Sequence, residues 1–202
     1  MKKYLSLGNL CEVAYQIDRF TKQEGHYFFD SLIVEDDSYK SILDDASNFF
    51  LPENWVLSNS ATLLDKESSL KFMHEFELLP GAKDPEGRNV INAELIEAYL
   101  PIARQKFTYL KEKTLNIISD LSNEVFLIRR EDIYNVTDAL SRLNDIKSTF
   151  GHLNPRMKFV LLSNYCDEEV IEGDSFFLNI SRANIWSEDN DSWDRIFEII
   201  NK

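Results

Sequence analysis

The second half of the chain alternates short apolar runs with stretches of helical periodicity, and this alternation constrains the fold more than any other feature. Apolar runs occupy residues 125–128, 159–162 and 176–180, while residues 132–150 and 193–200 repeat their apolar side chains at helical spacing. Strands that are apolar throughout are buried on both faces, as in a parallel sheet covered by helices. We therefore predict an α/β fold in three layers, with a Rossmann-like or flavodoxin-like, mostly parallel sheet and helices on both faces.

The first twenty residues predict one more strand, turn and helix. Residues 4–7 form a short apolar run, Gly8 interrupts it, and helical spacing begins at Asn9 and ends near Phe20. The middle of the chain is less regular. There we expect extended segments at 55–57 and 70–78, and a loop over 80–88. We also expect a short helix starting at Asp36 or Asp37, and a helical stretch over 92–119 that breaks or restarts at Pro101.

Length and composition indicate one α/β domain over residues 1–202, because only six Gly and five Pro leave no sign of a long linker. The formal net charge of −13 disfavours nucleic acid and anionic membranes as partners. No signal peptide or membrane span is apparent, and two distant cysteines do not suggest a disulfide framework. We expect a cytoplasmic protein. Neither a metal-ligand spacing nor a phosphate-binding glycine motif occurs, so we expect no metal and no cofactor.

Polar residues follow the predicted strands, where α/β proteins bind their ligands. Gly8 and Asn9 follow the first strand, Arg129 and Arg130 close the second, and Asn164 follows the third. The two arginines are candidates to bind a carboxylate or phosphate of a substrate, together with Asn164. Surface ion pairs with the many acids are the alternative for both arginines.

Cys11 lies in the first turn of the first predicted helix, where backbone N–H groups and the helix dipole favour a thiolate. Catalysis by a thiolate needs a base, and His74 is the candidate, with Asp30 as the group that orients it. Backbone N–H groups from Gly8 to Cys11 are candidate oxyanion donors. Packing is the alternative: cysteine often fills space near such turns, and His74 shares its strand face with Phe72 and Phe76.

Several short motifs resemble those of the DUF1796 family, whose members are labelled papain-like cysteine peptidases. Residues 6–11 match its SLGxxC signature, Phe29-Asp30 is similar to the FD of its PFDW motif, and residues 72–76 resemble its FxHDF element. Phe28, Ser31 and Glu75 depart from the family's proline, tryptophan and aspartate. The resemblance implies a Cys11 nucleophile and a His74 base. It also implies a papain-like fold by label, whereas the strand–helix alternation predicts a parallel sheet, and we base the fold on the alternation.

Three functional hypotheses follow. The first is a cysteine-dependent hydrolase or acyltransferase with a Cys11–His74–Asp30 site, acting on a small-molecule, glycan or peptide substrate. The second is a non-peptidase α/β module that binds or transfers a sugar-type or nucleotide-type ligand. The third is a catalytically silent interaction domain with an acidic surface. We favour the first, because the cysteine and histidine of the resembled motifs are both present.

Overall fold

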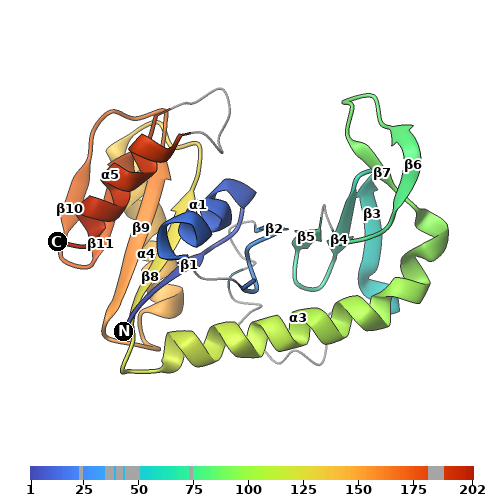
Figure 1. Cartoon of the computed structure of the whole chain (residues 1–202), viewed down its shortest axis with the longest axis horizontal. Coiled ribbons are helices and arrows are strands. Elements are labelled where there is room, and N and C mark those ends of the chain that lie inside the picture. Colours follow the sequence, from blue (N-terminus) through green and yellow to red (C-terminus); the bar gives the residue numbers. More distant parts are fainter. Residues whose placement is uncertain (23–24, 35–38, 40–42, 44–50, 73–74, 182–188) are drawn as a thin grey trace.

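The computed structural model describes residues 1–22, 25–34, 39, 43, 51–72, 75–181 and 189–202. Among these residues, a five-stranded sheet A has the order β1-β8-β9-β11-β10 (Figure 1). Its strands are β1 (Lys2–Ser6), β8 (Glu124–Arg130), β9 (Met157–Ser163), β11 (Ser175–Asn179) and β10 (Val170–Glu172). The first four run parallel and β10 pairs antiparallel with β11. The predicted α/β fold with a mostly parallel sheet is confirmed.

Helices cover both faces of sheet A, and strand β8 shows why. Its side chains alternate between two apolar clusters, because successive residues of a strand point to opposite faces. Phe126 and Ile128 pack on the face of α1 (Cys11–Thr21) and α5 (Asn190–Ile200). Val125 and Leu127 pack on the face of α4 (Val136–Phe150). In α5 the buried residues recur at helical spacing; they are Trp193, Ile196, Phe197 and Ile200.

The strand order runs in one direction along the chain, from β1 through β8 and β9 to β11. A Rossmann or flavodoxin sheet instead reverses its order at one point, and its ligand binds in the crevice there. The described part of sheet A has no such reversal. The carboxyl ends of its parallel strands still lie along one edge, formed by the residues after β1, β8, β9 and β11. We call this the carboxyl edge of sheet A.

A second group of strands, which the sequence analysis resolved only in part, lies beside sheet A (Figure 1). Sheet B is antiparallel, in the order β2 (Leu32–Ile33), β5 (Leu70–Phe72), β4 (Thr62–Asp65) and β3 (Trp55–Asn59). Strands β6 (Leu78–Lys83) and β7 (Asn89–Ile91) form a separate hairpin. The expected loop over 80–88 is wrong in part, because β6 includes Pro80 and Gly81. The register of the hairpin is irregular between Leu78 and Lys83, where a proline is tolerated.

The remaining helices join the two groups of strands. A short 3-10 helix, η2 (Pro52–Asn54), precedes β3, and another, η3 (Ala93–Leu95), leads into the long helix α3 (Ile96–Ser119). Helix α3 continues without a break through Pro101. None of the helices in the described part of the chain is long and apolar enough to span a membrane. Most of the helix expected after Asp36 or Asp37 lies outside the described residues.

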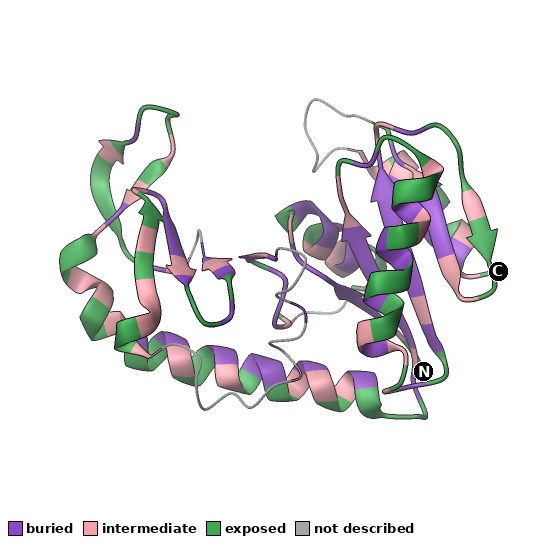
Figure 2. Ribbon diagram, turned by 180° about the vertical axis from the view of Figure 1, so that it is seen from behind, coloured by how far each residue is buried: buried purple, intermediate pink, exposed green. Residues whose placement is uncertain are grey.

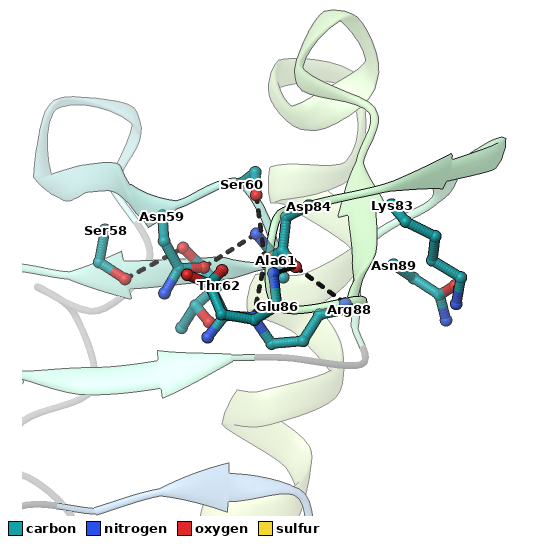
Figure 3. A network of polar contacts seen from close by, with 10 residues as sticks. All are labelled: Ser58, Asn59, Ser60, Ala61, Thr62, Lys83, Asp84, Glu86, Arg88 and Asn89. Atoms are coloured by element: carbon teal, nitrogen blue, oxygen red, sulfur yellow. Dashed lines mark hydrogen bonds and ion pairs between the residues drawn. The ribbon is translucent and has the colours of Figure 1, made fainter.

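The hairpin tip is held by Asp84, whose carboxylate organises the turn between β6 and β7 (Figure 3). Asp84 accepts the backbone N–H groups of Glu86 at 3.0 Å and Arg88 at 2.8 Å, and the Arg88 Nε at 2.7 Å. The Ser60 hydroxyl donates to the same carboxylate at 3.3 Å, which ties the hairpin to the β3–β4 turn. These hydrogen bonds stabilise the turn between β6 and β7. The need for such a turn explains why the segment is rich in Pro, Gly and charged residues.

One apolar cluster extends through both groups of strands. It includes Leu127 of sheet A, Phe107 of α3 and Phe72 of sheet B, and the buried side of α3 faces this cluster (Figure 2). Phe107 contacts the rings of Phe28 and Phe72 edge to face, at 6.0 and 4.9 Å between centroids. The two sheets therefore share a core, and the segment around β2 lies at their junction.

Candidate functional site

The turn between β1 and α1 has a backbone shape that depends on glycine. Gly8 has φ +80° and Asn9 has φ +75°, both in the left-handed region. A Cβ on Gly8 would lie 2.7 Å from Val34 Cγ2 and 2.8 Å from the Leu32 carbonyl oxygen. The Gly8 N–H donates to the Ser6 hydroxyl at 3.1 Å, and the Asn9 N–H donates to Leu32 O at 2.9 Å. The N–H groups of Gly8 and Asn9, two of the predicted oxyanion donors, thus already have acceptors within the protein.

Cys11 is the first residue of α1 and is exposed. Surrounding protein atoms nevertheless desolvate the thiol and raise its pKa, and the charge of Asp30 raises it further. The N–H of Cys11 itself acts in the opposite direction and is outweighed. The raised pKa runs against the stabilised thiolate that we expected from the position of Cys11 at the helix N-terminus.

Asp30 is buried, with 8% of its surface exposed, in the turn before β2. Burial raises its pKa from 3.8 to about 7, and the charge of Asp18 adds to this increase. The Tyr27 N–H, 2.6 Å from Asp30 Oδ2, and the Lys113 ammonium favour the carboxylate and limit the rise. A carboxyl group with this pKa exchanges its proton near neutral pH, which suits a general acid or base.

Asp18, His26 and Lys113 complete a charged cluster around Asp30 that the sequence analysis missed. Burial raises the pKa of Asp18, while His26 and Lys113 act to lower it. The Lys113 Nζ donates to the carbonyl oxygen of His26 at 2.9 Å and lies 4.5 Å from the centre of the Tyr27 ring. Asp18 lies seven residues after Cys11 and on the same face of α1. This spacing alone could have placed Asp18 near the site from the sequence.

Three segments that are far apart in the sequence meet at β2. Leu32 receives the N–H of Asn9 on its carbonyl oxygen, donates its own N–H to Phe29 O, and pairs with Phe72 of β5. The SLGxxC-like turn, the FD-like turn and the strand that begins the third motif thus lie against one another. His74 lies outside the described residues. Glu75, which follows it, lines a cavity of about 110 Å³ whose other walls include His26, Ser31 and Lys106.

Arg129 does not serve as the predicted substrate ligand. Its side chain is 2% exposed, and its guanidinium donates to Leu7 O at 3.0 Å, to Val34 O at 2.9 Å and to the carboxylate of Glu131. Each of its three nitrogens has a protein acceptor. Arg129 holds the end of β1 against the segment after β2, so it is a structural residue and the binding role is corrected.

Arg130, the last residue of β8, and Asn164, which follows β9, are brought together at the carboxyl edge, as their positions in the sequence suggested. Arg130 Nη2 donates to Asn164 Oδ1 at 3.4 Å, and Nη1 donates to the carboxylate of Glu12. The other oxygen of Glu12 accepts the indole N–H of Trp193 at 2.9 Å. Glu12 is 4% exposed and directly follows Cys11, so this buried ion pair fixes the first turn of α1 against the edge of sheet A.

Within the described residues, no group of three or more His, Cys, Asp or Glu side chains is placed to hold a metal ion. In comparisons with known proteins, no family model, no curated protein and no solved structure matches this chain. The resemblance to the DUF1796 family therefore stays a prediction from the short motifs alone.

Proposed function

We propose that this protein is a cysteine-dependent hydrolase or acyltransferase in which Cys11 is the nucleophile. The observation that carries the proposal is the meeting of the Cys11 turn, the Asp30 turn and β5 around Leu32. An exposed thiol whose pKa responds to the charge of a buried carboxyl group combines a nucleophile with a proton carrier in one region. Arg130 and Asn164 would contact a polar group of the substrate farther along the same edge.

The reaction would begin with attack of the Cys11 sulfur on an acyl carbon. The thiol proton passes to a base, and the carbonyl oxygen becomes an oxyanion near the N–H of Cys11 at the start of α1. Collapse of this intermediate expels an alcohol, amine or thiol, which takes the proton from the protonated base. Water then cleaves the thioester in a hydrolase, or a second substrate does so in an acyltransferase, and the Cys11 thiol is restored.

Asp30 is the base that the described residues support. Above pH 7 Asp30 can accept a proton as a carboxylate, and the raised pKa of Cys11 favours the thiol form that would donate one. His74 remains the base predicted from the sequence. In that arrangement Asp30 would stabilise the imidazolium instead. A peptidase activity, a cytoplasmic location and a small-molecule, glycan or peptide substrate belong to the same proposal.

The proposal is tested by trapping the acyl-enzyme. The intact protein would be mixed with p-nitrophenyl acetate, an acyl thioester and an N-acetylated peptide ester, and followed by nitrophenolate release and intact-mass spectrometry. We expect one acyl group on Cys11 with at least one substrate, a burst of product, and loss of both in Cys11→Ala. Cys166→Ala is the matched control, because Cys166 is the buried second cysteine and should leave the burst unchanged.

Asp30→Asn and His74→Gln then decide between the two bases. The acylation rate rises near pH 7 because the base loses its proton there. The variant in which this rise disappears therefore identifies the base. Acylation that persists in Cys11→Ala, or modification at Cys166 alone, would refute the proposed nucleophile.

A further inference from the structure

Two tyrosines contact each other at the carboxyl edge of sheet A, where Tyr165 directly follows Asn164. Tyr134 follows the end of β8 and Tyr165 follows the end of β9. Their ring centroids are 4.8 Å apart and the rings are tilted by 44°. Tyr134 is 65% exposed and Tyr165 is partly exposed. The ring of Tyr134 is too exposed to serve the packing of the core. The pair therefore presents aromatic surface to solvent at the end of the sheet where α/β proteins bind ligands.

A buried hydroxyl group holds both tyrosine-bearing segments in place. Ser163, the last residue of β9, has no exposed surface. Its Oγ accepts the N–H of Ile133 at 3.1 Å and the N–H of Tyr165 at 3.2 Å, and donates to Ile133 O at 2.8 Å. Ile133 directly precedes Tyr134. The backbone under each ring is thus fixed before any ligand arrives, which lowers the entropy lost on binding.

The charges around the pair disfavour an anionic ligand. Arg129 and Arg142 both donate to Glu131, and Arg130 donates to Glu12, so each of these arginines at the edge already has a carboxylate partner. Three exposed acidic residues lie close to the tyrosines in the sequence; they are Asp132, Asp167 and Glu168. Phosphate and nucleotide ligands would meet repulsion here, and the net charge of −13 adds to it.

We propose that Tyr134 and Tyr165 form a platform that binds a neutral carbohydrate. The C–H face of a pyranose ring is apolar and stacks on an aromatic ring, while its hydroxyl groups point outward. Carboxylate oxygens of Asp132 and the amide of Asn164 supply acceptors and donors for those hydroxyl groups. The inference goes beyond the proposed acyl transfer and does not depend on Cys11.

The test uses the full-length protein with maltotriose, cellotriose and triacetylchitotriose as probes. Binding would be measured by saturation-transfer NMR and isothermal titration calorimetry. We expect at least one probe to bind, with Tyr134→Ala weakening it at least about tenfold and Tyr134→Phe retaining it, because stacking needs the ring and not the hydroxyl. Tyr109→Ala is the matched control, since Tyr109 is 62% exposed on α3 and lies outside the platform. Cys11→Ala should bind normally, which separates this result from that of the proposed function.

Failure of all three probes to bind at up to about 10 mM would overturn the proposal, since such a weak interaction corresponds to less than about 3 kcal/mol of binding free energy. Equal affinity of wild type and Tyr134→Ala would also overturn it, as would binding of a proline-rich peptide in place of sugars. Tyr165→Ala and Ser163→Ala are checked by circular dichroism. If these two variants unfold, the binding result for Tyr134→Ala is used alone, because its ring is mostly exposed and its removal should leave the fold intact.

Discussion

The buried carboxyl group of Asp30 makes a specific prediction about how stability depends on pH. Its pKa is raised from 3.8 to about 7 in the folded protein, so the folded state binds this proton more tightly than the unfolded chain does. The contribution is fully present below about pH 4 and is lost as the pH rises through about 7. At 1.36 kcal/mol per pKa unit, the loss is at most about 4 kcal/mol.

Asp30→Asn removes this dependence, because an amide does not ionise, while its oxygen can still accept the Tyr27 N–H that now lies 2.6 Å from Oδ2. The free energy of unfolding, measured by urea denaturation from pH 4 to pH 8, should therefore rise in the variant relative to wild type. We expect the difference between the two proteins to grow by about 2–4 kcal/mol over that range.

Asp145→Asn is the charge control, since Asp145 is exposed on α4 and its loss also removes one carboxylate. Its difference from wild type should stay nearly constant over the same range. A difference between Asp30→Asn and wild type that is equally constant would refute the raised pKa. The assignment of Asp30 as a proton carrier near neutral pH would then fail as well.

Three further predictions concern the support of the site and its pH profile. Gly8→Ala should lower the free energy of unfolding by about 3 kcal/mol, because the new Cβ meets Val34 and Leu32, whereas Gly87→Ala at a similar φ in open space should cost about 1 kcal/mol. Glu12→Ala should lower the free energy of unfolding by about 3 kcal/mol, because the charge of Arg130 and the Trp193 N–H lose their carboxylate partner. Glu169→Ala breaks the exposed ion pair with Arg195 and should lower it by less than about 1 kcal/mol. Urea denaturation checks both pairs, and equal effects within either pair would contradict the packing described. If Asp30 is the base, kcat/KM should rise with pH around 7 in wild type and become flat in Asp30→Asn, and an unchanged profile would exclude that role.

Local patterns were sufficient where tertiary contacts agree with them. The buried strands β8, β9 and β11 each have an apolar centre, and each was expected within a few residues of its observed bounds. Helix α4 begins later than expected, because the side chain of Asn135 accepts the N–H of Asp138 and caps the helix there. Sheet B was harder, since β2 has only two residues and depends on pairing with β5, nearly forty positions away.

The site shows the same division. The position of Cys11 at the start of a helix followed from the change of period at Gly8, but the direction of its pKa did not, because it depends on burial and on Asp30. Arg129 and Arg130 are adjacent basic residues at the end of one strand, yet two of the acceptors of Arg129 are the carbonyl oxygens of Leu7 and Val34, which lie far from it in the sequence. Lys113 reaches the Asp30 cluster from α3, and no feature of the sequence predicted this.

The coupling between Cys11 and Asp30 is measured most directly by the pH dependence of iodoacetamide alkylation at Cys11, followed by peptide mass spectrometry in wild type and Asp30→Asn. The structure predicts that Cys11 reacts in the folded protein with an apparent pKa above that of a free thiol, about 8.5, and that this pKa falls in Asp30→Asn because a negative charge has been removed. A Cys11 that reacts only after unfolding, or whose pKa is the same in both proteins, would contradict a shared site.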